Sequence, residues 1–144
     1  MSIDSVLVVC TANICRSPLA EVVLREALPK VAVESAGVAA LVDESADPNA
    51  RAVALEHGLD VSSHIARQID AQLILQNELV LAMDAQQINW IVQQFPHARG
   101  RVFLLGHWSN ESEVPDPYRL PIETYRDVFS LIEEYAAQWR ARVG

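Results

Sequence analysis

Short runs of β-branched and apolar residues alternate along this chain with segments of helical periodicity, and this alternation limits the folds that it can adopt. The runs with strand character are residues 5–9, 31–34, 78–82 and 101–105. Apolar residues at helical spacing follow at 17–28, 48–57, 84–95 and 122–142. Because such short apolar runs are typical of strands buried on both faces, we predict an α/β fold with a four-stranded parallel sheet and helices on both faces.

Size and charge narrow the class of protein further. A chain of 144 residues, 51% of them hydrophobic, fits one domain with one core, so residues 1–144 are treated as a single domain. The formal net charge of −8 argues against binding of nucleic acid or of anionic membrane surfaces. The sequence contains no signal-like start and no apolar stretch of about 20 residues, so we expect a cytoplasmic protein that does not insert into membranes.

The two cysteines, Cys10 and Cys15, lie close together near the N-terminus. A disulfide framework would distribute cysteines along the chain, whereas a close pair in a reducing compartment indicates chemistry or metal binding. No histidine pair or second cysteine pair accompanies them, so a zinc site is not expected. We predict no metal and no cofactor.

The segment from Cys10 to Arg16 lies between the first predicted strand and the first predicted helix, where ligands of parallel sheets bind. If the five intervening residues curl, their N–H groups converge on an anion, and the positive end of the helix favours the same charge. Arg16 could hold phosphate oxygens with two parallel hydrogen bonds, and the positive field would stabilise a nucleophilic thiolate at Cys10. Ser17 is a candidate N-cap, and Pro18 suits the first helical position. The predicted phosphate-binding residues are Thr11, Ala12, Asn13, Ile14, Cys15, Arg16 and Ser17.

A Cys-x5-Arg match is weak evidence by itself, because a cysteine after a buried strand is usually a small core residue. The segment lacks glycine and a Gly-Lys-Ser/Thr ending, which argues against an ATP-binding loop. Expulsion of a phenolate also calls for a general acid, and Asp116, flanked by two prolines, is the best candidate. The same residues are equally consistent with an ordinary surface turn.

Four segments together resemble one family, the low-molecular-weight protein tyrosine phosphatases. Residues 9–18 resemble the family's signature loop and residues 116–118 its C-terminal acid motif, and residues 34–37 and 63–68 resemble two further blocks. The similarity extends from about residue 5 to residue 140. It implies a four-stranded parallel sheet and metal-independent hydrolysis of phosphotyrosine on proteins.

The resemblance also implies a role for each matching residue. Cys10 corresponds to the nucleophile, Arg16 to the ligand of the phosphate and of the transition state, and Asp116 to the general acid that later activates water. Ser17 corresponds to the hydroxyl that hydrogen-bonds the thiolate and assists its departure from the phosphoenzyme.

Three other residues correspond to supporting positions, and two correspond to positions at the substrate mouth. Asn13 matches the residue that holds the loop in a left-handed turn, a conformation that Asn tolerates. Ser35 and His64 match its partners, and Leu41 and Tyr118 match positions at the mouth of the site.

The loops are most similar to those of bacterial phosphatases that are paired with tyrosine kinases of capsule and exopolysaccharide synthesis. This similarity rests on residues 105–108 and 115–119 and makes an autophosphorylated tyrosine kinase a candidate substrate. Two positions depart from the family pattern. Ala12 replaces a frequent Gly, so we expect a φ that Ala tolerates. Tyr118-Arg119 stands where the eukaryotic members carry two aromatics, which leaves substrate preference open.

Three alternatives remain. A phosphopeptide-binding module could keep the anion site without turnover, although the joint presence of Cys10, Arg16 and Asp116 argues against it. A thioredoxin-coupled arsenate reductase would require additional distant cysteines, which this chain lacks. A redox sensor built on Cys10 and Cys15 could coexist with catalysis, and Cys15 is equally consistent with a packed core residue.

Overall fold

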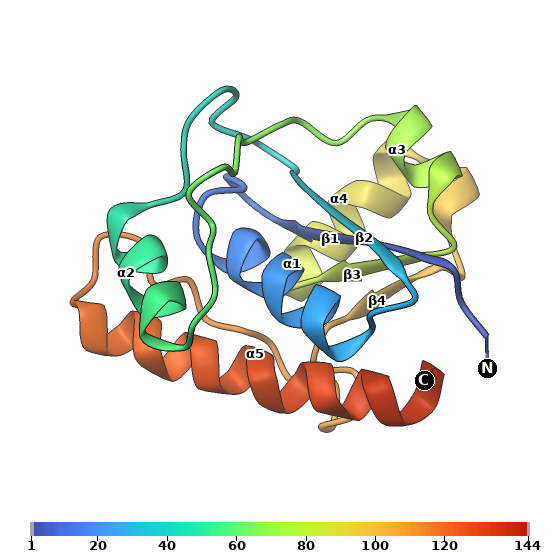
Figure 1. The fold of residues 1–144 in the computed structure, drawn as a ribbon. Coiled ribbons are helices and arrows are strands. Elements are labelled where there is room, and N and C mark those ends of the chain that lie inside the picture. The colour runs from blue at the N-terminus through green and yellow to red at the C-terminus, as the bar shows by residue number, and fades with distance from the viewer. Residues whose placement is uncertain (1, 144) are drawn as a thin grey trace.

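The computed structural model describes residues 2–143, which form an α/β fold around a parallel sheet of four strands (Figure 1). The strands are β1 (Ser5–Cys10), β2 (Ala32–Gly37), β3 (Leu79–Ala82) and β4 (Val102–Leu104), arranged in the order β2-β1-β3-β4. The helices are α1 (Arg16–Ala27), α2 (Pro48–Glu56), α3 (Ala71–Gln76), α4 (Ala85–Gln94) and α5 (Ile122–Val143), with a 3-10 turn, η1, at Pro96–Ala98. The predicted fold class is therefore confirmed.

Side chains alternate across the sheet and divide the core into two layers. Val6 and Val8 of β1 pack in the cluster that contains residues of α1, α2 and α5, while Leu7 and Val9 pack in the cluster that contains residues of α3 and α4. Both layers are visible in Figure 1, with α5 along one side of the sheet and α4 on the other. Burial on both faces explains why the two central strands, β1 and β3, are almost continuously apolar.

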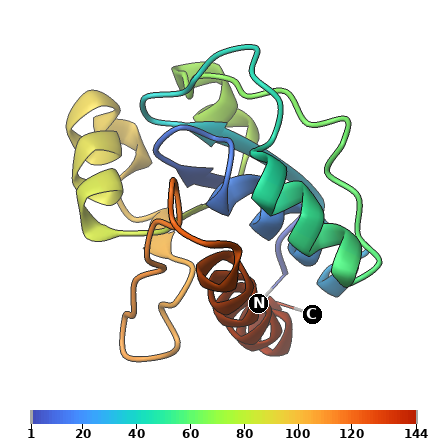
Figure 2. The same ribbon diagram turned by 90° about the vertical axis from the view of Figure 1, so that its left-hand side faces the viewer.

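The strand order makes the end of β1 the place where the chain changes direction across the sheet. From β1 the chain passes through α1 to β2 on one side, and it returns later to β3 on the other side of β1. Crossovers in opposite directions leave an open crevice beyond the carboxyl ends of these strands. In Figure 2 the loop after β1 lies between the segment that follows β2 and the segment that follows β4.

Two local predictions differ from the structure. The short helix α3 was not predicted, because six residues are too few to establish a helical period. The assignment of Ser17 as N-cap is wrong: α1 begins at Arg16 with Cys15 in the cap position, and Pro18 is the third helical residue. The Ser17 hydroxyl makes hydrogen bonds within the loop instead of capping the helix.

Among residues 2–143, no helix combines the length and the apolar character that crossing a bilayer requires.

Candidate active site

The loop from Cys10 to Arg16 holds its carbonyl groups on its outer side. The carbonyl oxygens of residues 10, 11 and 12 accept hydrogen bonds from the backbone N–H groups of Val38, Ala39 and Leu41, at 3.0, 2.9 and 3.0 Å respectively. The next two carbonyl oxygens, of residues 13 and 14, accept from Nε2 of His64 at 2.6 Å and from the N–H of Asp47 at 2.8 Å.

This arrangement determines where the loop N–H groups point. In a trans peptide the C=O and the following N–H point in opposite directions, and none of the described peptide bonds is cis. When a carbonyl points outward, the N–H of the next residue therefore points toward the inside of the loop. The sequence thus folds into the converging set of donors that an anion requires.

A cavity of 140 Å³ lies at this loop. It is lined by Cys10, Thr11, Ala12, Ile14, Cys15, Arg16, Asp116 and Tyr118. Two segments about a hundred residues apart therefore form one site: the loop after β1 and the segment between β4 and α5. This is the juxtaposition of Cys10, Arg16 and Asp116 that phosphoryl transfer to a thiol would need.

Asn13 is the centre of the hydrogen bonds behind the loop. Its backbone adopts the left-handed conformation, with φ of 61°, and its side chain is fully buried. The side-chain N–H₂ donates to Oγ of Ser17 at 2.7 Å and to Oγ of Ser35 at 3.1 Å, while its Oδ1 accepts from the N–H of Arg67 at 3.0 Å. All polar groups of the Asn13 amide are satisfied, as burial of an amide requires.

The hydrogen bond from Asn13 determines which group is the donor between Ser17 and Cys10. Oγ of Ser17 lies 3.0 Å from Sγ of Cys10 and already accepts a hydrogen bond from Asn13. Its own proton is therefore available to the sulfur, and the N–H of Asn13, 3.3 Å away, also donates there. Both donors stabilise the anionic form of the sulfur, which is the nucleophilic form.

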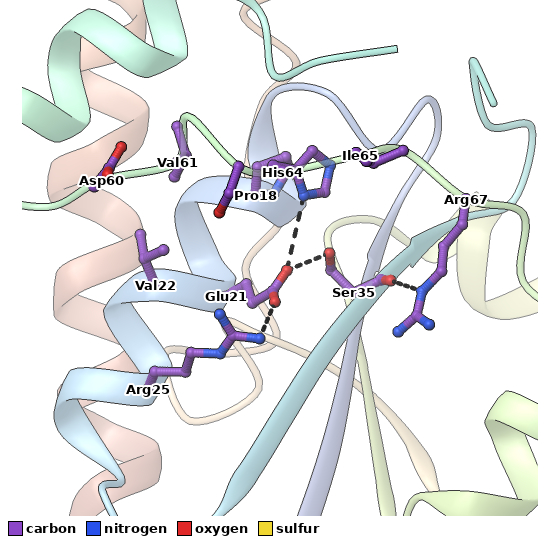
Figure 3. Close-up of a pocket in the computed structure, with 11 residues that line it drawn as sticks. Pro18, Glu21, Val22, Arg25, Ser35, Asp60, Val61, His64, Ile65 and Arg67 are labelled. Carbon is purple, nitrogen blue, oxygen red and sulfur yellow. Dashed lines mark hydrogen bonds and ion pairs between the residues drawn. The ribbon is translucent and has the colours of Figure 1, made fainter. Parts of the chain in front are cut away.

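The chain of hydrogen bonds continues behind Asn13 to Glu21 (Figure 3). Ser35 accepts from Asn13 and donates to Oε1 of Glu21 at 2.5 Å, and Glu21 also pairs with Arg25 one turn along α1. Because Nε2 of His64 faces a carbonyl oxygen, it must carry a proton, which leaves Nδ1 facing Glu21 at 4.0 Å. These side chains line a second cavity, of 280 Å³, between α1 and residues 60–67.

Arg16 is oriented by two groups outside the loop. Its Nη1 donates to the carbonyl oxygen of Val114 at 2.8 Å and lies 3.4 Å from the carboxylate of Asp84, and the side chain is almost fully buried. Gln87, on the first turn of α4, donates from Nε2 to the hydroxyl of Thr11 at 3.1 Å. The corner between β3 and α4 therefore contacts both ends of the loop.

The remaining predicted residues lie at or near the entrance. Asp116 is exposed, and its Oδ1 accepts from the N–H of Tyr118 at 3.1 Å. Tyr118 lines the cavity, whereas Leu41 is exposed and does not. Ala12 is not among the residues with positive φ. The backbone at this position, where the family often has Gly, therefore has a φ that Ala tolerates, as expected.

Cys15 lies in a different environment from Cys10. Its Sγ is 3.7 Å from the hydroxyl of Tyr125 on α5, and burial raises the pKa of its thiol to about 12. Burial also raises the pKa of the Tyr125 hydroxyl, so that both groups keep their protons near neutral pH. Cys15 is therefore a packed thiol, and its burial opposes formation of the thiolate.

Sequence reasoning did not find Glu21, Arg67, Asp84 or Gln87, all of which contact the loop or its direct partners. Asp84 and Gln87 form a capping box that opens α4 directly after β3, so their position at the ligand-binding edge was readable from the pattern Asp-x-x-Gln. Glu21 and Arg67 carry no such local signal, because their partners are distant in the sequence.

The comparisons with known proteins agree with this geometry. The family model described as "Low molecular weight phosphotyrosine protein phosphatase" matches residues 5–144. The chain belongs to this family. It is 48% identical over 136 residues to the low-molecular-weight protein-tyrosine-phosphatase Wzb of Escherichia coli K12, covering 94% of this chain and 92% of Wzb. The match to the probable phosphatase AmsI of Erwinia amylovora is 40% over 137 residues, covering 95% of each chain.

Solved structures of related phosphatases have the same fold as this chain. Wzb of Escherichia coli K30 in complex with sulphate superposes with a TM-score of 0.95 at 42% identity, over 99% of both chains. A YwlE arginine phosphatase from Geobacillus stearothermophilus superposes with a TM-score of 0.91 at 33% identity, over 96% of this chain and 92% of the other. This chain is accordingly a low-molecular-weight protein tyrosine phosphatase of the bacterial type, and the prediction of the family and of the enzyme class is confirmed.

Within residues 2–143, no group of three or more His, Cys, Asp or Glu side chains could hold a metal ion.

Proposed function

We propose that this phosphatase hydrolyses phosphotyrosine on proteins through a phosphoenzyme at Cys10, and that residues 1–144 act as one catalytic domain. The thiolate of Cys10 attacks phosphorus in line with the departing phenolic oxygen, so that the S–P bond forms as the P–O bond breaks. The inward N–H groups of the loop and the guanidinium of Arg16 stabilise the equatorial oxygens. Asp116 donates a proton to the phenolate, which would otherwise be a poor leaving group.

In the second step, Asp116, now a carboxylate, takes a proton from the water that attacks the phosphocysteine. Cys10 leaves as a thiolate, and the Ser17 hydroxyl 3.0 Å away stabilises the negative charge on sulfur. Phosphate is the product, and Cys10 and Asp116 are back in their starting protonation states, because the proton that Asp116 gave to the phenol has been replaced by one from water. Asn13, Ser35 and His64 support the loop and do not touch the reacting atoms.

The observation that carries this proposal is the outward orientation of five consecutive loop carbonyls around Cys10. It supports an anion site whose donors are already in place before the substrate arrives, which is the condition for electrostatic stabilisation of the transition state. A binding module without turnover would have no need of a thiol with two donors aimed at it.

The shape of the site favours phosphotyrosine over other phosphoamino acids. Cys10 is only 3% exposed, so a phosphoserine, with its short side chain, would bring the substrate backbone against the rim before phosphorus reached sulfur. Ala12, Ile14 and Tyr118 give the entrance apolar side chains, against which a phenyl ring can pack. The guanidinium of phosphoarginine, the substrate class named for the YwlE relatives, would need more acceptors than the single carboxylate of Asp116.

The test compares one peptide sequence carrying phosphotyrosine, phosphoserine or phosphoarginine, with chelator present throughout. We expect hydrolysis of the phosphotyrosine peptide alone, with kcat/KM at least about a hundredfold above the other two, because only the ring spans the depth of the site. Faster hydrolysis of phosphoarginine, or no hydrolysis of phosphotyrosine, would contradict the proposal.

We further propose a cytoplasmic enzyme that opposes a tyrosine kinase of polysaccharide synthesis or export. A reducing compartment supports a mechanism that depends on the free thiol of Cys10. The likeness of residues 105–108 and 115–119 to capsule- and exopolysaccharide-associated phosphatases supports the pathway, and an autophosphorylated kinase is the candidate partner.

A further inference from the structure

Residues 66–69 form a short strap that runs alongside the end of β2, near the active-site loop. The N–H of Gly37 donates to the carbonyl oxygen of Arg67 at 2.9 Å, and the N–H of Ile69 donates to the carbonyl oxygen of Gly37 at 2.9 Å. The strap thus pairs with Gly37 like an additional parallel strand, centred on Gln68. A Cβ on Gly37 would lie 2.6 Å from the carbonyl oxygen of Thr11, so strap, strand end and loop are in direct contact.

The side-chain amide of Gln68 makes two hydrogen bonds to the segment that follows β2. Its Nε2 donates to the carbonyl oxygen of Val38 at 2.8 Å, and its Oε1 accepts from the N–H of Ala40 at 2.9 Å. The amide therefore satisfies a donor and an acceptor of one exposed turn at the same time. Gln68 is itself exposed and contributes little to the core.

The peptide group that Gln68 holds is the one that orients the loop. The carbonyl of Val38 belongs to the same peptide as the N–H of Ala39, and that N–H donates to the carbonyl oxygen of Thr11 at 2.9 Å. The carbonyl of Thr11 in turn shares a peptide with the N–H of Ala12, which points toward the cavity. Two planar trans peptides thus connect the amide of Gln68 to a donor for the phosphate.

We propose that Gln68 is a positioning residue of the phosphate site, acting through the Val38–Ala39 peptide to aim the N–H of Ala12 at the anion. This inference rests on the proposed function of the loop as a phosphate site. Aligned hydrogen bonds also polarise one another, so the same chain strengthens the Ala12 donor as well as directing it. Arg67, the neighbour of Gln68, fixes the other side of the loop through its N–H bond to Asn13.

The test replaces Gln68 by Met, which keeps the length of the side chain and removes both hydrogen bonds. The matched control is Gln72→Met, an exposed glutamine of α3 that takes part in none of the side-chain hydrogen bonds found within residues 2–143. The probes are inorganic phosphate, as a competitive inhibitor of aryl phosphate hydrolysis, and the ¹H–¹⁵N signal of Ala12 with and without phosphate. We expect the inhibition constant of phosphate to rise about three- to tenfold in Gln68→Met, and to stay at the wild-type value in the control.

The amide signals separate positioning from a general loss of structure. The downfield shift of the Ala12 amide on phosphate binding should shrink in Gln68→Met, while that of Ser17, at the start of α1, stays unchanged. Equal inhibition constants in Gln68→Met and Gln72→Met, or equal weakening of both amide shifts, would overturn the inference. The variant Gln68→Glu gives a second measurement. It keeps the acceptor for the N–H of Ala40 but places a carboxylate against the carbonyl oxygen of Val38, so we expect weaker phosphate binding. Phosphate binding as tight as in wild type would also overturn the inference. Failure of the wild-type enzyme to hydrolyse the aryl phosphate would instead overturn the proposed function.

Discussion

The two halves of the active site are built differently. The loop after β1 is bonded from outside at every carbonyl from residue 10 to residue 14, and its central Asn13 is fully buried. The segment that carries Asp116 is anchored at Val114, whose N–H donates to Met83 at 2.9 Å, but beyond that point its hydrogen bonds are local, such as that from Tyr118 to Asp116. The half proposed to bind phosphate is thus preorganised, while the half proposed to donate the proton is exposed and less constrained.

This difference matches the demands of the two tasks. Stabilising a transition-state charge requires donors that need no reorganisation, so rigidity is an advantage in the loop. Protonating a leaving group on a protein substrate requires access, and the proposed acid, Asp116, lies on an exposed segment beside Tyr118. Variants of the two halves should therefore fail in different ways.

Arg16→Lys should produce the largest loss. Lysine keeps the positive charge but not the planar pair of donors, and it cannot reproduce the bond to Val114 in the same geometry. We expect kcat/KM for an aryl phosphate to fall about a hundredfold or more. Steady-state kinetics should be compared with Arg140→Lys, an exposed arginine of α5 that should behave like wild type. An Arg16→Lys rate within a few-fold of wild type would mean that Arg16 is only a source of charge.

Asp116→Ala should show a loss that depends on the leaving group. For phosphotyrosine we expect kcat to fall on the order of a hundredfold, and for an aryl phosphate with a strongly acidic phenol only a few-fold, because that phenolate leaves without a proton. The measurement is the slope of log kcat against leaving-group pKa in the variant and in Asp127→Ala, an exposed acid of α5. Identical slopes would assign the proton transfer to another group.

Asn13→Ala should lower kcat/KM by roughly ten- to thirtyfold, without removing any direct contact of a side chain with phosphate. The variant loses the bonds to Ser17, Ser35 and Arg67, and it places alanine, which tolerates the left-handed region less well than asparagine, at a φ of 61°. Thermal stability should fall as well, since the amide is buried. Asn89→Ala, on the exposed face of α4, is the control for both measurements. Wild-type kinetics in Asn13→Ala would show that the loop keeps its shape without this centre.

Cys15→Ser should have the smallest effect on steady-state activity and a specific effect on oxidation. Both cysteines line the same cavity, so a sulfenic acid formed on Cys10 by peroxide lies near a thiol that could resolve it as a disulfide. Because burial raises the pKa of the Cys15 thiol to about 12, the thiol is protonated near neutral pH, and resolution should be slow. We expect wild type to recover activity with reductant after peroxide, and Cys15→Ser to lose it permanently. Equal recovery of both proteins would assign Cys15 to packing alone.

The sequence predicted the strands of the sheet well. It predicted poorly which residues make hydrogen bonds to the loop of residues 10–16, and both outcomes have a physical reason. Strands such as residues 5–9 are recognisable because burial on both faces leaves a local apolar pattern. Ser17 was misassigned because Ser before Pro is typical of a helix N-cap, whereas its hydroxyl bonds Cys10 and Asn13. The roles of Glu21 and Gln68 could not be predicted. Their hydrogen-bond partners are distant in the sequence, and no local sequence pattern indicates which distant segments come together in the fold.

Phosphoenzyme trapping tests the central claim, that Cys10 is the nucleophile of a phosphotyrosine phosphatase, most directly. The enzyme is mixed with a phosphotyrosine peptide and quenched in acid within milliseconds, and the peptides that contain residues 10–16 are analysed by mass spectrometry. We expect one phosphoryl group on Cys10, and none in Cys10→Ser quenched at the same times, with circular dichroism showing that the variant is folded. A Cys10→Ser variant that turns over phosphotyrosine at a rate near wild type, or a wild-type enzyme that releases phosphate with no phosphoryl group on Cys10 at any time, would contradict the account.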